Sequence, residues 1–142
     1  MSIQSILLPM VVQVLLTFIL LFWMIGLRLQ ALRRGQVRAE SIALRESKWP
    51  PRVIQIGNAF HNQLEVPVLF YVVMLLALET QTLDLFILVL AWMFVVSRIV
   101  HAWIHVTSNQ LEHRTPVFLV GAIAVLLIWI IVIGRVIVFT SL

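Results

Sequence analysis

The chain has 142 residues, of which 62% are hydrophobic and 11% are charged, and its mean hydropathy is +1.08. Because a typical soluble domain carries about 25% charged residues, this composition excludes an ordinary water-soluble globular fold. The absence of cysteine excludes disulfides, Cys-ligated zinc and a cysteine nucleophile, and the net charge of +4 is concentrated in one segment, which argues against nucleic-acid binding. One helical crossing needs about 20 residues, so we expect a single membrane domain over residues 1–142.

The first expected element is a membrane-spanning helix over about residues 6–27, an uncharged run interrupted by Gln13 and Thr17. A basic loop follows over residues 28–51, and Arg52 stands directly after it. Because basic loops are retained on the cytoplasmic side of a membrane, we expect this loop to be cytoplasmic and the N-terminus to lie on the other side.

Three further helices are expected, over about residues 52–79, 83–106 and 116–138. Four crossings place the loop at 106–115 on the cytoplasmic side as well, and they leave Arg135 as the basic residue near the opposite side. The predicted fold class is therefore an all-α integral membrane protein, a multi-pass bundle of four transmembrane helices, located in the inner membrane if the source is bacterial.

Polar side chains interrupt the second and third helices in a regular pattern. On the second helix they lie at i, i+3, i+4 and i+7 and comprise Asn58, His61, Asn62 and Glu65. On the third helix the residues that share one face are Arg98, His101 and His105. Ionisable groups in a membrane cost several kcal/mol unless they are paired or hydrated, so we expect the two faces to meet around a polar ligand cavity.

Two other interpretations of these side chains remain open. Glu65 and Arg98 are able to form a purely structural ion pair, with the histidines reaching the lipid headgroups. Alternatively, His101 and His105 have the spacing of two metal ligands one helical turn apart, with a third ligand from His61, Glu65 or His113. Arg98 shares the face of the two histidines and repels a cation, so no metal is expected.

The run Arg114–Thr115–Pro116 marks the expected start of the fourth helix. We expect Thr115 to be the N-cap, because proline suits the first helical turn. Arg114 then stands beside the helix N-terminus, where free N–H groups and the helix dipole favour a bound anion such as a thiolate. The alternative is that Arg114 only anchors the loop, paired with Glu112.

These motifs together resemble the MAPEG family, the membrane-associated proteins of eicosanoid and glutathione metabolism, and look like a bacterial member of it. The likeness covers nearly the whole chain, and the spacing of sixteen residues from Arg98 to Arg114 is similar to that of the microsomal prostaglandin E synthase branch. The segments that carry it are Asn62-x-x-Glu65 followed by Pro67, Arg98-x-x-His101-x-x-x-His105, and Arg114-Thr115-Pro116.

The resemblance implies a homotrimer in which neighbouring subunits enclose a bent glutathione as co-substrate. It implies that Arg114 stabilises the glutathione thiolate, with Thr115 beside it where the family often has serine. It also implies a set of glutathione-binding residues, namely Arg28, His61, Asn62, Glu65, Arg98, His101 and His105. The sequence departs from the family pattern at three positions, where Asn58 stands for an arginine and His105 and Phe118 stand for tyrosines.

The functional prediction is a membrane-bound glutathione transferase or glutathione-dependent peroxidase or isomerase. It would serve detoxification and act on a lipophilic electrophile that arrives through the lipid bilayer. Two alternatives come from other classes: a non-catalytic four-helix membrane scaffold, and a small multidrug-type transporter. The transporters carry a membrane-embedded carboxylate in the first helix, and the run at 6–27 has none.

Overall fold

The computed structural model describes residues 3–38, 40 and 48–140. Its elements in chain order are α1 (Ile3–Arg33), α3 (Pro51–His61), the 3₁₀ turn η1 (Asn62–Leu64), α4 (Val66–Glu79), α5 (Leu85–Val106) and α6 (Leu111–Thr140). No strand occurs in these ranges. Four stretches are long and apolar enough to cross a membrane, namely Gln4–Arg33, Pro51–Glu79, Leu85–Val106 and Leu111–Val138. The predicted all-helical fold with four membrane spans is confirmed.

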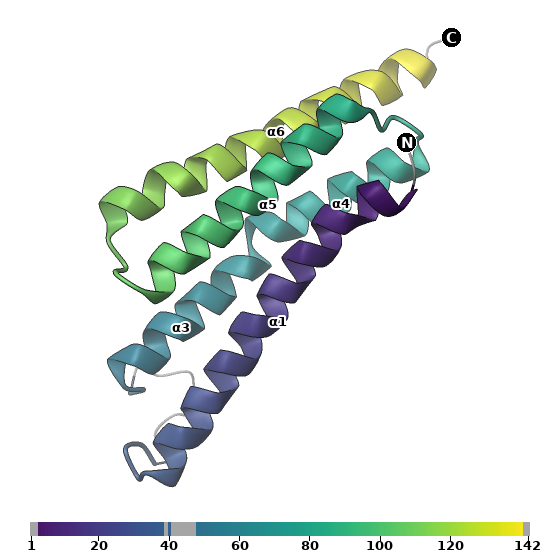
Figure 1. Ribbon diagram of the computed structural model, residues 1–142. Helices are drawn as coiled ribbons and strands as arrows, with labels where there is room; N and C mark the ends of the chain where they lie inside the picture. The colour runs from purple at the N-terminus through teal and green to yellow at the C-terminus, as the bar shows by residue number, and fades with distance from the viewer. Residues whose placement is uncertain (1–2, 39, 41–47, 141–142) are drawn as a thin grey trace.

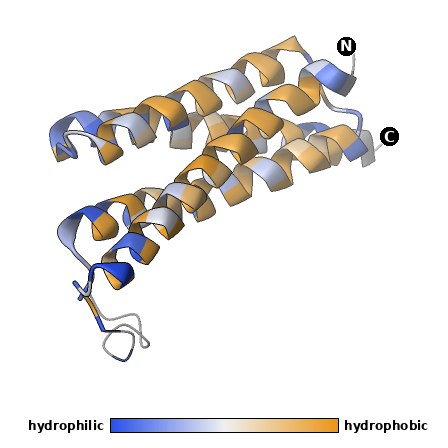
Figure 2. Cartoon of the chain, turned by 60° about the horizontal axis from the view of Figure 1, so that its bottom comes forward, coloured by the Kyte–Doolittle hydropathy of each residue, from blue (hydrophilic) through white to orange (hydrophobic). Residues whose placement is uncertain are grey.

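The four spans run side by side along a common direction (Figure 1). α1 packs on α3 and α5, while α6 packs on α5 and α4. The two chain ends lie at the same end of the bundle, as an even number of crossings requires (Figure 1). Apolar residues cover the shafts of the helices and polar residues gather toward their ends (Figure 2), which is the distribution expected of a bundle whose outer surface contacts lipid.

Two helices extend beyond the apolar runs that predicted them. α1 continues to Arg33, so Arg28 lies within a helix and not in the predicted loop 28–51. α6 begins at Leu111, five residues before Pro116, and the backbone N–H of Arg114 already donates to the carbonyl of Gln110 at 3.0 Å. The prediction that Thr115 is the N-cap is therefore wrong. Proline is tolerated here because, so close to the helix start, its missing N–H leaves a single carbonyl, that of Glu112, without its helical donor.

The second span is interrupted in its middle, which the periodic pattern did not predict. α3 ends at His61, η1 covers the next three residues, and α4 begins at Val66. Pro67 explains the break, because it has no N–H to offer the carbonyl four residues earlier and its ring collides with that carbonyl. Glu65, two residues before it, has φ −101° and ψ −104°, outside helical geometry. The polar residues of this span therefore do not lie on one continuous helix, because α3, η1 and α4 succeed one another through this segment.

Near this break, two glutamines from different spans pair inside the bundle. Gln13 of α1 is fully buried, and its Nε2 donates to Oε1 of Gln63 at 2.9 Å. Gln63 in turn donates from Nε2 to the carbonyl of Ala59 at 3.1 Å. Hydrocarbon offers no other hydrogen-bond partner, so the pair joins α1 to η1 by a contact that lipid cannot replace.

Gly121 of α6 lies against α5 and leaves less room for a side chain than any other described glycine. A Cβ at this position would stand 2.3 Å from Oγ of Ser97, which donates to the carbonyl of Phe94 at 2.6 Å. We expect Gly121→Ala to destabilise the protein by about 1–3 kcal/mol, measured by denaturation in detergent micelles. Gly134→Ala in the same helix is the control, because it meets no atom within 4 Å. In a Ser97→Ala background, Gly121→Ala should cost less stability than it does in the wild-type background. An equal loss of stability in the two backgrounds would contradict the steric explanation.

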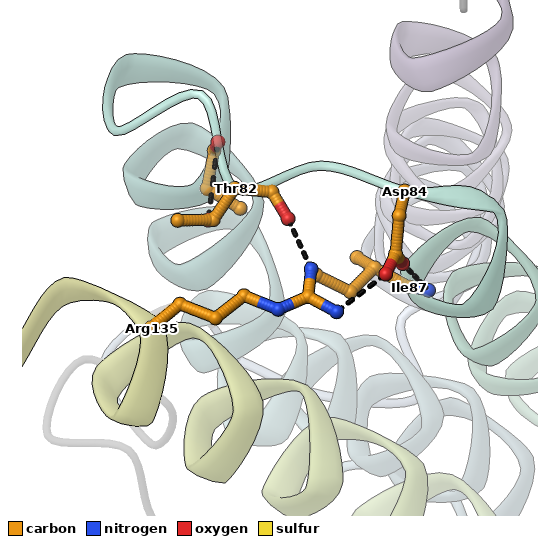
Figure 3. A network of polar contacts seen from close by, with 5 residues as sticks. Thr82, Asp84, Ile87 and Arg135 are labelled. Atoms are coloured by element: carbon orange, nitrogen blue, oxygen red, sulfur yellow. Dashed lines mark hydrogen bonds and ion pairs between the residues drawn. The ribbon is translucent and has the colours of Figure 1, made fainter. Parts of the chain in front are cut away.

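At the end of the bundle that carries the chain termini, Arg135 of α6 holds the turn between α4 and α5 (Figure 3). Its guanidinium donates to the carbonyl of Thr82 at 2.5 Å and forms an ion pair with Asp84. Asp84 also caps α5, since its Oδ1 accepts from the N–H of Ile87 at 2.8 Å. The hydrogen bond from Ile87 and then the contact with Arg135 lower the pKa of Asp84 below its usual 3.8.

This pKa shift predicts a dependence of stability on pH. Because the folded protein holds Asp84 ionised, the stabilisation is present above about pH 4 and is lost as the pH falls through the lowered pKa. Asp84→Asn keeps a capping side chain but removes the charge. We therefore expect the melting temperature of wild type to exceed that of Asp84→Asn at neutral pH, and the difference to shrink as the pH falls below about 4 and through the lowered pKa. A difference in melting temperature that stays constant with pH would contradict this role.

Candidate functional site

A pocket of about 210 Å³ opens between the second span and the facing parts of α5 and α6. Its lining residues come from the middle of the second span, from the last turns of α5 and from the first turns of α6, namely Asn62, Glu65, His101, Arg114, Thr115 and Phe118. The pocket thus brings together five polar groups and one aromatic ring. The polar groups are a carboxylate, a guanidinium, an amide, an imidazole and a hydroxyl. The polar faces of the second and third spans thus meet at a pocket, as expected, and α6 forms a further wall of it.

α5 supplies two buried histidines near its C-terminus, with ring centroids 5.9 Å apart. Nδ1 of His101 lies 3.1 Å from the backbone carbonyl of Arg114 and therefore carries the proton. The ring of His101 also lies 5.7 Å from that of Phe118. His101 lines the pocket and His105 does not.

Two side chains of α3 hold the C-terminal end of α5. Nε2 of Gln55 donates to the carbonyl of His105 at 2.8 Å, and Nη1 of Arg52 donates to the carbonyl of Val106. These contacts satisfy carbonyls that have no helical partner at the end of α5. Sequence analysis missed both residues, although polar side chains at the start of a helix beside a loop are a recognisable signal for such capping.

Arg98 is almost completely buried one turn deeper in α5, at 1% exposure. Its Nη2 donates to the carbonyl oxygen of Asn62 at 3.1 Å and to the side-chain Oδ1 of the same residue. The structure shows no ion pair between Arg98 and Glu65, both of which it describes, so the structural pair considered from the sequence is not formed. The break at η1 explains this result, because it replaces the regular helical spacing that aligned the two residues.

Arg114 is partly exposed and lies within the second turn of α6. Its Nη1 donates at 2.6 Å to Oδ1 of Asn109, whose positive φ of 53° belongs to the turn after α5. The predicted pairing of Arg114 with Glu112 is replaced by this contact. The other guanidinium nitrogens remain for a ligand in the pocket that Arg114 lines.

Four of the predicted site residues do not line this pocket. Arg28 lies on α1 with its guanidinium 5.3 Å from the ring of Trp49. His61 is exposed, with its ring beside Phe60. Arg98 and His105 are buried behind the lining residues. Within the described ranges no three His, Cys, Asp or Glu side chains are grouped closely enough to hold a metal ion.

Comparisons with known proteins gave a match to a family model. No curated protein and no solved structure matches the chain. The model of the MAPEG family matches residues 6–134, which include all the pocket residues and nearly the full length of the four spans. The chain therefore belongs to the MAPEG family.

Proposed function

We propose that the protein is a membrane-bound glutathione transferase or glutathione-dependent peroxidase that acts on lipophilic electrophiles. The observation that carries this proposal is the pocket between Asn62, Glu65, His101 and Arg114, which combines one anionic and one cationic side chain in a chain that is otherwise mostly apolar. Glutathione carries an ammonium group, two carboxylates and a thiol. Glu65 is suited to the ammonium, and Arg114 to an anionic sulfur or carboxylate.

The proposed reaction begins with glutathione bound as its thiolate beside Arg114. A guanidinium favours the thiolate over the thiol by direct charge interaction, and the thiolate is the reactive nucleophile. In a transfer reaction the sulfur forms a bond to an electrophilic carbon while the leaving group departs with the bond electrons. Thr115 lines the same pocket and offers a hydroxyl donor to the sulfur. Phe118 supplies an apolar wall of the pocket.

The volume of the pocket supports assembly of the chain into a homotrimer with shared sites. Ligand pockets usually measure about 300–1,000 Å³, and the single chain offers about 210 Å³. A neighbouring subunit would complete the enclosure, and Arg28 would then serve the pocket of that neighbour. Native mass spectrometry in detergent should report a trimer. A monomer that binds glutathione with full affinity would remove the shared site from the proposal.

The decisive test of the function is a titration of the purified protein with glutathione in detergent. Ultraviolet absorbance reports the thiolate, calorimetry reports affinity, and turnover is measured with an aryl halide and with a fatty-acid hydroperoxide. We expect saturable binding, a thiolate signal and turnover of at least one of the two substrates. A wild-type protein that binds no glutathione would overturn the proposal.

The proposed orientation places the pocket in the cytoplasmic half of the membrane and the basic segment in the cytoplasm. Cysteine labelling in intact cells should find Asn109 and Arg34 protected, and Gln81 accessible from outside, because basic loops are retained on the inner side. All three positions are exposed in the folded chain, so protection reflects the membrane and not burial. Labelling of Asn109 from outside would reverse the orientation.

A further inference from the structure

The amide of Asn62 is oriented by a buried cation. Arg98 has no acceptor atom, so the atom of the Asn62 side chain that it contacts must be the oxygen. Nη2 of Arg98 bonds both the backbone and the side-chain oxygen of Asn62, and no other hydrogen bond of Arg98 occurs in the described part of the chain. The orientation of this amide is therefore fixed by the chemistry of its partner.

Reversing the amide would be strongly unfavourable in this position. Arg98 is 1% exposed, and its Nε and Nη1 atoms are already buried without a partner. A reversed amide would place N–H donors against the guanidinium and would leave the buried charge with the backbone carbonyl as its one acceptor. The charge of Glu65 acts on Arg98 without a direct ion pair, and the guanidinium lies 5.6 Å from the ring centroid of Phe118, but neither contact supplies the hydrogen bond that Oδ1 accepts.

We infer that Arg98 acts through Asn62: by holding the side-chain oxygen, it orients the amide so that Nδ2 is the atom offered to the pocket, and the ligand atom held by Nδ2 is an acceptor such as a carboxylate or peptide oxygen. This inference rests on the proposed function for its natural ligand and assigns the polarity of one position in that site. With Oδ1 turned to the guanidinium, Nδ2 is the donor of this amide, and it makes no hydrogen bond within the described residues. Arg98 is thus a positioning residue that does not line the pocket, in contrast to the binding role that the family resemblance implied.

The sharpest variant is Asn62→Asp, which keeps the oxygen that Arg98 needs and removes the donor. We expect a melting temperature at or above that of wild type, because a carboxylate pairs better with the buried guanidinium than an amide does. Glutathione affinity should nevertheless fall about tenfold or more, because the ligand acceptor then faces an acceptor. Asn58→Asp is the matched control: it adds the same charge one turn earlier on α3, at an exposed position outside the pocket. Equal affinities of Asn62→Asp and Asn58→Asp would overturn the inference.

A double-mutant cycle tests whether Arg98 acts through Asn62 or contacts the ligand itself. Arg98→Met should weaken glutathione binding several-fold in the wild-type background and leave it unchanged in an Asn62→Ala background. The same loss in both backgrounds would mean direct contact and would overturn the positioning role. If Arg98→Met fails to fold, the comparison of Asn62→Asp with Asn58→Asp still decides the question.

Two small probes separate this inference from the proposed function. Hexanoate and hexylammonium have the same chain length and opposite polarity, and each is titrated by calorimetry. We expect Asn62→Asp to bind hexanoate more weakly than Asn58→Asp does. The two variants should bind hexylammonium with similar affinity, or Asn62→Asp more tightly. If wild type binds hexanoate in this way but binds no glutathione, the proposed function is wrong and the polarity of Asn62 stands. If it binds neither glutathione nor hexanoate, both are wrong.

Discussion

Replacing Arg114 with alanine should slow conjugation about a hundredfold while reducing glutathione affinity much less. The reason is that the guanidinium acts on the charge of the sulfur, and removing one donor that stabilises a reacting anion costs about 10²–10³ in rate. Binding is retained because Asn62, Glu65 and His101 still line the pocket. Lysine at this position should restore part of the rate, since it supplies a point charge without the planar fork. The measurement is the thiolate absorbance and the rate at saturating glutathione.

The Arg114 variant needs a control because it also removes the contact with Asn109. Asn109→Gly removes the same hydrogen bond, leaves the guanidinium in place and suits the positive φ of 53° at that residue. We expect Asn109→Gly to retain most of the rate. A full rate in Arg114→Ala would exclude Arg114 as the group that stabilises the thiolate. An equal loss in both variants would assign the effect to the turn between α5 and α6.

Replacing Glu65 with glutamine should lower glutathione affinity by about tenfold to a hundredfold, since a charged hydrogen bond contributes about 1.5–3 kcal/mol. The free energy of unfolding should fall by about 1 kcal/mol or less, because Glu65 is exposed and acts on the charge of Arg98 without a direct ion pair in the described structure. Calorimetric titration and thermal denaturation in the same detergent measure the two quantities separately.

Glu79→Gln provides the matched control for Glu65→Gln. It removes the same charge from an exposed position at the far end of α4, outside the pocket. Affinity should be unchanged in this variant. If Glu65→Gln lowers the melting temperature strongly and leaves affinity intact, Glu65 stabilises the fold and does not bind the ligand.

The number and order of the membrane spans could be predicted from hydropathy, but the helix ends could not. Hydropathy reports where the chain leaves the apolar part of the membrane, and a helix is free to continue into the polar region. α1 continues through Arg28 to Arg33, and α6 begins at Leu111 within a polar run. The prediction of Thr115 as the N-cap is wrong because it equates the start of the apolar run with the start of the helix.

The composition of the site was largely predictable, while its internal pairing was not. Helical spacing correctly brought Asn62, Glu65 and His101 to one cavity. The same spacing suggested Arg98 opposite Glu65, because it assumes an unbroken helix through Pro67. In the structure the 3₁₀ turn intervenes and Arg98 bonds Asn62 instead. Which acceptor a buried arginine takes depends on distances of a few ångströms, which periodicity does not resolve.

The pair of glutamines at the break also determines how far α1 can slide along its neighbours. Moving α1 by one helical turn would displace Gln13 by about 5.4 Å, well beyond hydrogen-bond reach of Gln63. Nε2 of Gln13 and Oε1 of Gln63 would then lose their partners in an apolar interior, whereas the surrounding apolar side chains would find equivalent contacts at the new position. The amide pair therefore specifies the axial register of the first span, together with the side-chain hydrogen bond between Thr17 of α1 and Tyr71 of α4. The height of Arg28 relative to the membrane surface is fixed by the same register.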